Sequence, residues 1–134
     1  MLGLLMLLVT TTTPTITEQI QIIERSVPQV NVEPTETDKV INKIIDVFGK
    51  DSEVMLKIAK CESGLKQHDD NGNVLVSSTS DTGAFQINQV HNENLNKLKL
   101  DPRKLDDNVR YAKMLFDASG TRDWYKSKGC WSKL

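Results

Sequence analysis

Residues 61–88 read CESGLKQHDDNGNVLVSSTSDTGAFQIN, and they carry the strongest structural signals of the chain. Residues 68–73 are turn formers, and the pair Asn71-Gly72 among them is typical of a tight β-hairpin. The apolar run 74–76 follows as a short strand. Gly64 is expected to end the helix that precedes the turn. This stretch therefore predicts a helix end followed by two or three small strands.

Two helices are predicted upstream of this stretch. A helix start at residues 35–38 is followed by apolar residues at helical spacing, and Gly49 ends the pattern. These apolar residues are Val40, Ile41, Ile44, Ile45 and Phe48. Asp51 and Ser52 are expected to cap the second helix, which carries Glu62 in its last turn. Its apolar face is expected to consist of Val54, Ile58 and Cys61, with Met55 and Ala59 beside it.

Beyond Asn88 the chain returns to helical patterns. We expect one short helix over residues 92–100 and another that opens at Asp101-Pro102, with Asp as the cap and Pro at the first position. A third helix is predicted over 107–119 and a last short one over 123–127. Helices around one small hairpin indicate the α+β class, mostly helical.

The 134 residues suit one modest domain with a tail. Apolar residues make up 38% and charged residues 26%, which is ordinary for a soluble globular protein. The formal net charge of −1 gives no reason to expect a nucleic-acid partner. We divide the chain into an apolar segment (1–12), a Thr- and Pro-containing linker expected to be disordered (13–37) and a folded domain (38–134).

The apolar run MLGLLMLLV at residues 1–9 is too short for a membrane-spanning helix, which needs about 20 residues. It is typical of the apolar core of a secretory signal, although no basic residue precedes it and no A-x-A cleavage site follows. The alternatives are an uncleaved short anchor, which would tether the chain to a membrane, and a truncated gene start. We expect a secreted or cell-surface protein.

The chain has two cysteines, Cys61 and Cys130, and their spacing excludes a zinc site of the two-plus-two kind. In an exported protein two cysteines usually pair. Such a bridge would close a loop of about 70 residues and stabilise the domain by roughly 4 kcal/mol. The alternative is two unrelated buried thiols. His68 and His91 are expected at the surface, and no metal or other cofactor is expected.

Two acidic residues of the 61–88 stretch are candidates for catalysis. Glu62 ends a helix, where backbone carbonyls carry a partial negative charge, and apolar neighbours should raise the pKa of its carboxyl further. A raised pKa is what a general acid needs near neutral pH. Asp81 lies among Ser80, Thr82 and Gly83, a polar setting that favours the ionised form. Two carboxyls whose pKa values differ in this way are typical of glycosidases.

Residues 61–64 (CESG) resemble the start of the catalytic segment of bacterial lytic transglycosylases and resuscitation-promoting factors. Residues 83–87 (GAFQI) resemble the next segment of the transglycosylases, and residues 81–88 (DTGAFQIN) are similar to a segment of animal-type lysozymes. Residues 108–112 and the ending from Trp124 to Trp131 extend the resemblance, which covers about residues 39–134. The resemblance implies a lysozyme-like fold with a small β-hairpin that flanks an active-site cleft.

The resemblance also implies roles for individual residues. Glu62 would be the catalytic acid and Asp81 the second catalytic carboxylate, and the two cysteines would pair. The residues implied or considered for substrate binding are Ser63, Gln86, Asn88, Tyr111 and Trp124. From the residues alone, Ser63 could instead cap the helix end, Gln86 and Asn88 could turn the chain, and Trp124 could be buried. Leu115 stands where many transglycosylases have a tyrosine.

We therefore expect an enzyme that cleaves peptidoglycan glycan strands at the β-1,4 bond between N-acetylmuramic acid and N-acetylglucosamine. It would be a muramidase if water attacks the sugar, or a lytic transglycosylase if the muramoyl 6-hydroxyl attacks. One alternative is a lysozyme-like module that binds glycan or protein without cutting. Another is a wall-opening enzyme carried by a phage particle or a secretion apparatus. We expect a monomer.

Overall fold

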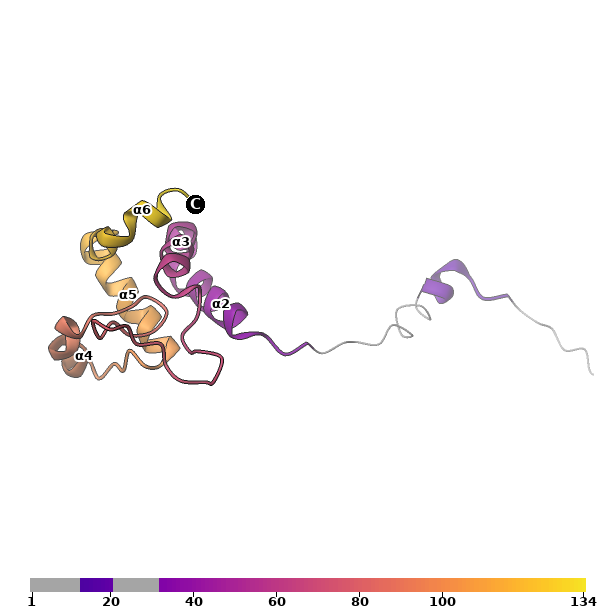
Figure 1. Cartoon of the computed structure of the whole chain (residues 1–134). Coiled ribbons are helices and arrows are strands. Elements are labelled where there is room, and N and C mark those ends of the chain that lie inside the picture. Colours follow the sequence, from indigo (N-terminus) through magenta and orange to yellow (C-terminus); the bar gives the residue numbers. More distant parts are fainter. Residues whose placement is uncertain (1–12, 21–31) are drawn as a thin grey trace, which may run out of the picture. The chain divides into compact units, whose positions relative to one another are not determined.

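Helices dominate the structure, a computed structural model that describes residues 13–20 and 32–134 (Figure 1). The signal-like segment 1–12 and part of the linker lie outside the described residues. Residues 34–134 form one compact unit, which is distinct from the part of the chain that precedes it. In that part, residues 16–20 are helical, and the Thr15 hydroxyl and Glu18 bond to each other's backbone N–H groups at its start. None of the described helices combines the length and apolar character needed to span a bilayer.

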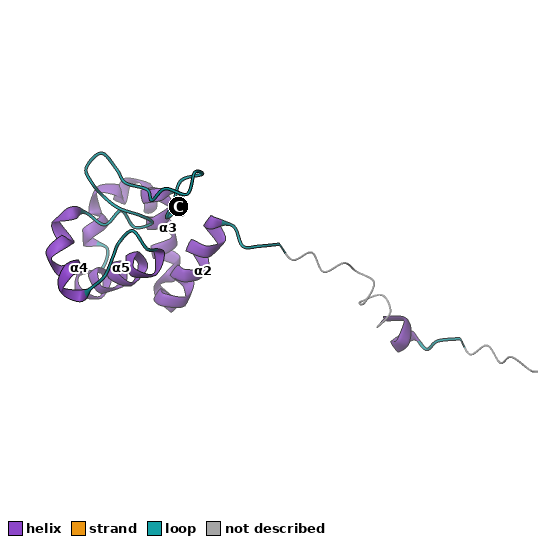
Figure 2. Ribbon diagram, turned by 90° about the horizontal axis from the view of Figure 1, so that it is seen from below, coloured by secondary structure: helices purple, strands orange, loops and turns teal. Residues whose placement is uncertain are grey.

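The unit of residues 34–134 consists of short helices joined by loops. In order these are α2 (Glu36–Phe48), the 3-10 turn η1 (Gly49–Asp51), α3 (Ser52–Ser63), η2 (Gln89–His91), α4 (Asn92–Leu98), α5 (Leu105–Ser119), η3 (Arg122–Ser127) and α6 (Lys128–Trp131). Helix α2 packs against α3 and α5, and α3 also packs against α6. The loop 64–88 connects α3 to η2, and Figure 2 shows it without a strand.

Helix α2 forms as its sequence predicts. The Thr35 hydroxyl accepts a hydrogen bond from the Asp38 N–H, and the Asp38 carboxylate accepts one from the Thr35 N–H, so two free donors of the first turn are satisfied. Val40, Ile44 and Phe48 lie four residues apart and are buried on one face. The helix ends at Gly49, as predicted.

Helix α3 also ends as predicted, because Gly64 adopts a left-handed conformation (φ 68°) after Ser63. Its start differs from the prediction. The Asp51 side chain makes no capping hydrogen bond, since η1 runs directly into the helix and already orders the first turn. The buried residues of α3 are Met55, Ile58 and Ala59. Of the predicted face only Ile58 is fully buried, and the inward face instead includes the two residues that were expected beside it.

The predicted two or three small strands are reduced to three isolated antiparallel bridges within the described chain. These bridges are His68–Val74, Val76–Thr82 and Thr82–Ile87. Side chains explain why no ladder develops. The Asp69 carboxylate accepts hydrogen bonds from the N–H groups of residues 71 and 73, and the Ser77 hydroxyl accepts from those of residues 79 and 81. Backbone donors that a strand partner would use are therefore taken by local side chains.

The later helices are confirmed with shifted bounds, with one exception. The helix predicted to open at Asp101-Pro102 does not form. Residues 101–104 make only a single turn, because the backbone of Lys104 is extended (φ −96°, ψ 133°) directly before α5 begins. The turn itself is closed by a bond from the Lys104 N–H to the Asp101 carbonyl. The segment predicted as a last helix is a 3-10 helix, η3.

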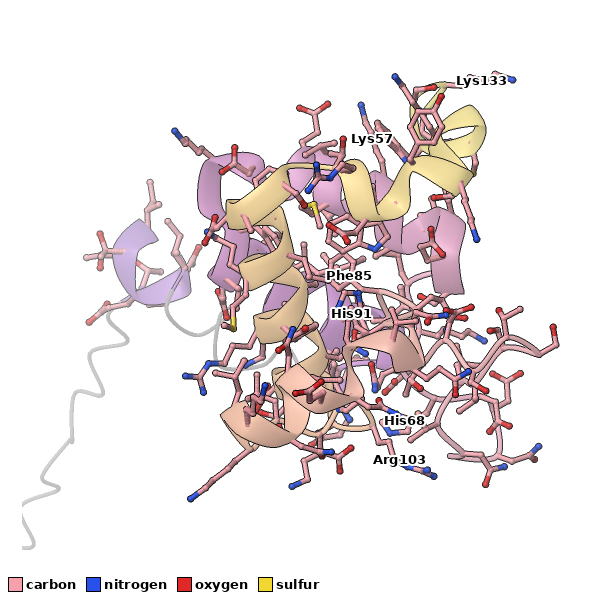
Figure 3. The ribbon with its side chains drawn as sticks, turned by 90° about the vertical axis from the view of Figure 1, so that its left-hand side faces the viewer. Lys57, His68, Phe85, His91, Arg103 and Lys133 are labelled. Atoms are coloured by element: carbon pink, nitrogen blue, oxygen red, sulfur yellow. A yellow bond between two sulfur atoms is a disulfide. The ribbon has the colours of Figure 1, made fainter. Side chains whose placement is uncertain are left out.

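The core contains a chain of aromatic rings around Phe85, which has no exposed surface. Its ring lies 5.7 Å from that of Phe48 and 5.8 Å from that of Trp124, centroid to centroid. Figure 3 shows Phe85 in the interior, among the helices. Phe85 belongs to the loop, Phe48 to α2 and Trp124 to η3, so this cluster fixes the loop against the helical body.

Candidate functional site

Two buried polar side chains hold the loop segment 82–85 in place. The Gln67 Oε1 accepts a hydrogen bond from the Ala84 N–H (2.8 Å), and the Asn108 Oδ1 accepts one from the Phe85 N–H (3.0 Å). Asn108 also donates to the carbonyls of Thr82 and Pro102. Both side chains have no exposed surface. The loop therefore receives from side chains the hydrogen bonds that a sheet would otherwise supply.

A cleft of about 860 Å³ lies between the end of α3, the loop, η2, α5 and η3. Its lining includes Glu62, Asp81, Gln86, Asn88, Tyr125 and Lys126. A second hollow of about 310 Å³ shares Glu62 and Gln86 with this cleft and is also lined by residues 75–77. Glu62 thus belongs to the lining of both hollows.

Glu62 occupies the last turn of α3 and is half-buried. The Ser127 hydroxyl donates a hydrogen bond to its Oε1 atom (2.5 Å). Loss of hydration raises the pKa of Glu62; the bond from Ser127 lowers it in part, and the negative charge of Asp81 raises it. The net effect is a raised pKa. The carboxyl therefore keeps its proton to a higher pH than an exposed glutamate, as a general acid must.

Asp81 faces the same cleft in a polar setting. Partial burial would raise the pKa of its carboxyl, but hydrogen bonds from Thr79, Asn88 and Ser77 and the charge of Lys126 outweigh this effect. Asn88 donates to one oxygen (2.5 Å), while Ser77 (2.8 Å) and Thr79 donate to the other. The pKa of Asp81 is therefore lowered. The same cleft therefore holds two different carboxyls: that of Glu62 favours the protonated form, and that of Asp81 favours the ionised form.

Three further predicted residues lie at the cleft or beside it. The Ser63 hydroxyl lies within hydrogen-bond distance of two acceptors, the Ala59 and Ala84 carbonyls, and accepts a hydrogen bond from the Lys66 N–H. It therefore ties the end of α3 to the loop. It lines the smaller hollow. Gln86 lines both hollows, and its amide donates to the Gly83 carbonyl. Asn88 combines a place in the cleft with its bond to Asp81.

The two predicted aromatic residues are both buried. Tyr111 is only 3% exposed and is not among the cleft residues; a hydrogen bond joins its hydroxyl to His91 Nδ1 (3.1 Å), and His91 is at the cleft. Trp124 is 4% exposed, and its Nε1 donates to the Phe85 carbonyl (3.0 Å). Trp124 lines the cleft with only this small exposed surface, in agreement with the buried alternative rather than with a freely stacking ring.

Sequence reasoning did not find several residues that shape the site. Ser127 contacts the carboxyl of Glu62 across 65 positions of the chain. Gln67 and Asn108 support the loop from the interior. No local pattern distinguishes a serine or glutamine that folds inward from one at the surface. Tyr125 also lines the cleft; its side chain is 69% exposed, and the Lys128 Nζ atom lies 5.8 Å from the centroid of its ring.

The predicted pairing of Cys61 with Cys130 is present as a disulfide, with 6.1 Å between the two Cα atoms. It joins the residue before Glu62 to α6. Within the ranges 13–20 and 32–134, no three His, Cys, Asp or Glu side chains gather closely enough to hold a metal ion.

Comparison with known proteins gives no match to a protein family, to a curated protein or to a solved structure. The chemistry of the cleft and the sequence motifs therefore carry the functional argument.

Proposed function

We propose that this protein cleaves the glycan strands of peptidoglycan at the β-1,4 bond between N-acetylmuramic acid and N-acetylglucosamine. The observation that carries the proposal is the pair of carboxyls in one cleft, with the pKa of Glu62 raised and that of Asp81 lowered. Such a division lets one carboxyl donate a proton while the other stays charged, as in lysozymes. The motifs in residues 61–64 and 81–88 resemble the same class of enzyme.

In the proposed reaction, Glu62 protonates the oxygen that bridges the two sugars. The bond to the anomeric carbon then breaks and positive charge develops on the muramoyl ring, which the negative charge of Asp81 stabilises. Either water or the muramoyl 6-hydroxyl attacks that carbon, and the ionised Glu62 takes up the proton of the attacking group. The first path leaves a reducing end and the second a 1,6-anhydro end.

The shape and lining of the site support a polymeric sugar substrate. The two hollows that Glu62 lines give room for more than one sugar unit. The exposed ring of Tyr125 offers an apolar face for a sugar, and Asn88 and Gln86 offer amide groups. We also propose that the helical body and the loop 64–88 form a lysozyme-like α+β fold, in which the three bridges mark the predicted hairpin.

The proposal places the protein outside the cytoplasm, at the secreted or cell-surface location where peptidoglycan and disulfides both occur. The disulfide Cys61–Cys130 is compatible with that location.

Digestion of purified sacculi, followed by mass spectrometry of the released fragments, tests the proposal. Cleavage of glycan strands releases muropeptides with reducing ends, or with anhydro ends that lack one water. Free peptides without sugar would instead indicate a peptidase. If the protein sediments with sacculi and releases nothing, it is a binding module and the enzymatic proposal is wrong.

A further inference from the structure

The hydroxyl of Ser127 lies within reach of two acceptors. Glu62 Oε1 is 2.5 Å away and the Trp124 carbonyl is 3.0 Å away. A hydroxyl has one proton to give, so it can serve only one of them at a time. The Trp124 carbonyl already accepts a bond from the Trp131 Nε1 (3.1 Å). Glu62 Oε1 is the nearer of the two acceptors and belongs to an ionisable carboxyl, so the Ser127 proton is assigned to Glu62.

Ser127 precedes α6 at a position where a serine usually caps a helix. Its side chain makes no capping hydrogen bond there. The hydroxyl is instead directed to Glu62, a residue 65 positions earlier in the chain. Its contact with the Trp124 carbonyl stays within the local segment, whereas the contact with Glu62 reaches another helix.

The backbone on both sides of this contact is tied together covalently. Cys61 precedes Glu62 and Cys130 follows Ser127 by three residues, and the two cysteines form the disulfide. The covalent link and the hydrogen bond join the last turn of α3 to the start of α6 at neighbouring points. The Ser127 hydroxyl is therefore held close to the carboxyl with little freedom to move away.

We propose that Ser127 is a positioning residue for Glu62: its hydroxyl occupies Oε1 and so directs the transferable proton to Oε2. This inference rests on the proposed function. A carboxylic acid carries its proton on one oxygen and accepts hydrogen bonds at the other. With Oε1 accepting from Ser127, Oε2 is the oxygen that carries the proton toward the sugar and takes one back from the attacking group. The same hydroxyl serves both protonation states of Glu62.

The test compares Ser127→Ala and Ser127→Thr with the wild-type protein in sacculus digestion across pH. Ser132→Ala is the matched control, because its hydroxyl also lies in the C-terminal segment but bonds only to the Lys128 carbonyl. We expect Ser127→Ala to lower kcat on the order of 10- to 100-fold, as loss of a hydrogen bond to a charged group does, with KM nearly unchanged. Ser127→Thr, which keeps the hydroxyl, should recover most of the rate.

The pH profile supplies a readout that a purely structural role would not move. The Ser127 bond stabilises the ionised carboxyl, so its loss should raise the pKa of Glu62 and shift the basic limb of the profile to higher pH. A carbon-detected NMR titration of the Glu62 carboxyl should show the same shift in Ser127→Ala and none in Ser132→Ala. If Ser127→Ala does not fold, Ser127→Cys, a weaker donor of similar size, is used and the same directions apply.

Two results would overturn the inference. One is a Ser127→Ala protein with wild-type kcat and an unshifted basic limb. The other is a rate that Ser127→Thr fails to recover although the variant is folded. If the wild-type protein releases no sugar fragments, the proposed function fails instead. In that case the NMR titration still tests the hydrogen bond between Ser127 and Glu62. An unchanged pKa of Glu62 in Ser127→Ala refutes this bond, and a raised pKa supports it.

Discussion

Replacement of Asn108 by alanine should destabilise the protein severely, because one amide side chain satisfies three backbone groups of the interior. Asn108 has no exposed surface. Its Oδ1 is the acceptor for the Phe85 N–H, and its Nδ2 donates to the carbonyls of Thr82 (2.8 Å) and Pro102 (2.9 Å). The three contacts join α5 to the loop on which the cleft depends.

The expected loss in the free energy of unfolding depends on which backbone groups keep another hydrogen-bond partner once the Asn108 amide is removed. The Thr82 carbonyl still accepts from the Ile87 N–H, and the Pro102 carbonyl still accepts from Gln67 Nε2. The Phe85 N–H is left without its acceptor in the core, which costs about 1–3 kcal/mol. The two weakened carbonyls and the small void add about 1–2 kcal/mol. The free energy of unfolding should therefore fall by about 2–5 kcal/mol.

Equilibrium denaturation in urea, followed by circular dichroism, measures this change. The midpoint should fall while the slope with urea stays constant, as expected when stability alone changes. Asn96→Ala, at an exposed position of α4, is the control and should change stability by no more than about 0.5 kcal/mol. A loss below about 1 kcal/mol for Asn108→Ala would refute the assignment of these hydrogen bonds as structural.

Three more substitutions test other parts of the structure. Replacing Cys61 and Cys130 by serine opens a loop of 69 residues and should lower the free energy of unfolding by about 4 kcal/mol in urea denaturation. Gly83→Ala should lower it by about 2–3 kcal/mol, because a Cβ atom would lie 2.5 Å from buried side-chain atoms at a positive φ of 73°. Glu62→Gln should raise the melting temperature at about pH 8 but not at about pH 3. Desolvation raises the pKa of Glu62, so its proton stabilises the fold below the ordinary pKa, and this contribution is lost as pH rises through the raised value.

For each of these three predictions, one result would contradict the reasoning. A double serine variant as stable as the oxidised protein would deny the disulfide any role in stability. An unaltered free energy of unfolding in Gly83→Ala would mean that the loop can move away from α5. A Glu62→Gln protein that gains the same stability at both pH values would show that desolvation of the charge is not the cause.

Helix positions could be predicted because their signals are local. The capping box of Thr35 and Asp38, the spacing from Val40 to Phe48 and the stop at Gly64 all involve residues within a few positions of each other. The same locality placed Glu62 in the last turn of α3. The motifs also marked Asp81, Gln86 and Asn88, which line the cleft.

Features that depend on distant contacts could not be predicted in this way. The Asn71-Gly72 signal marked a real turn, but the Asp69 and Ser77 side chains took the backbone donors that strands need. Tyr111 was expected to bind substrate and is instead buried against His91. The partner of Glu62, Ser127, becomes visible only when α3 and α6 are brought together.

The most direct test of the central claim is the rate of glycan-strand cleavage by Glu62→Gln near neutral pH. Glutamine keeps the shape of the side chain and cannot give up a proton. Glu53→Gln, at an exposed position of the same helix α3, is the matched control. If Glu62 is the acid, its variant should be folded and on the order of 100-fold slower or worse, while Glu53→Gln retains the wild-type rate. A Glu62→Gln protein that releases muropeptides as fast as the wild type would contradict the account.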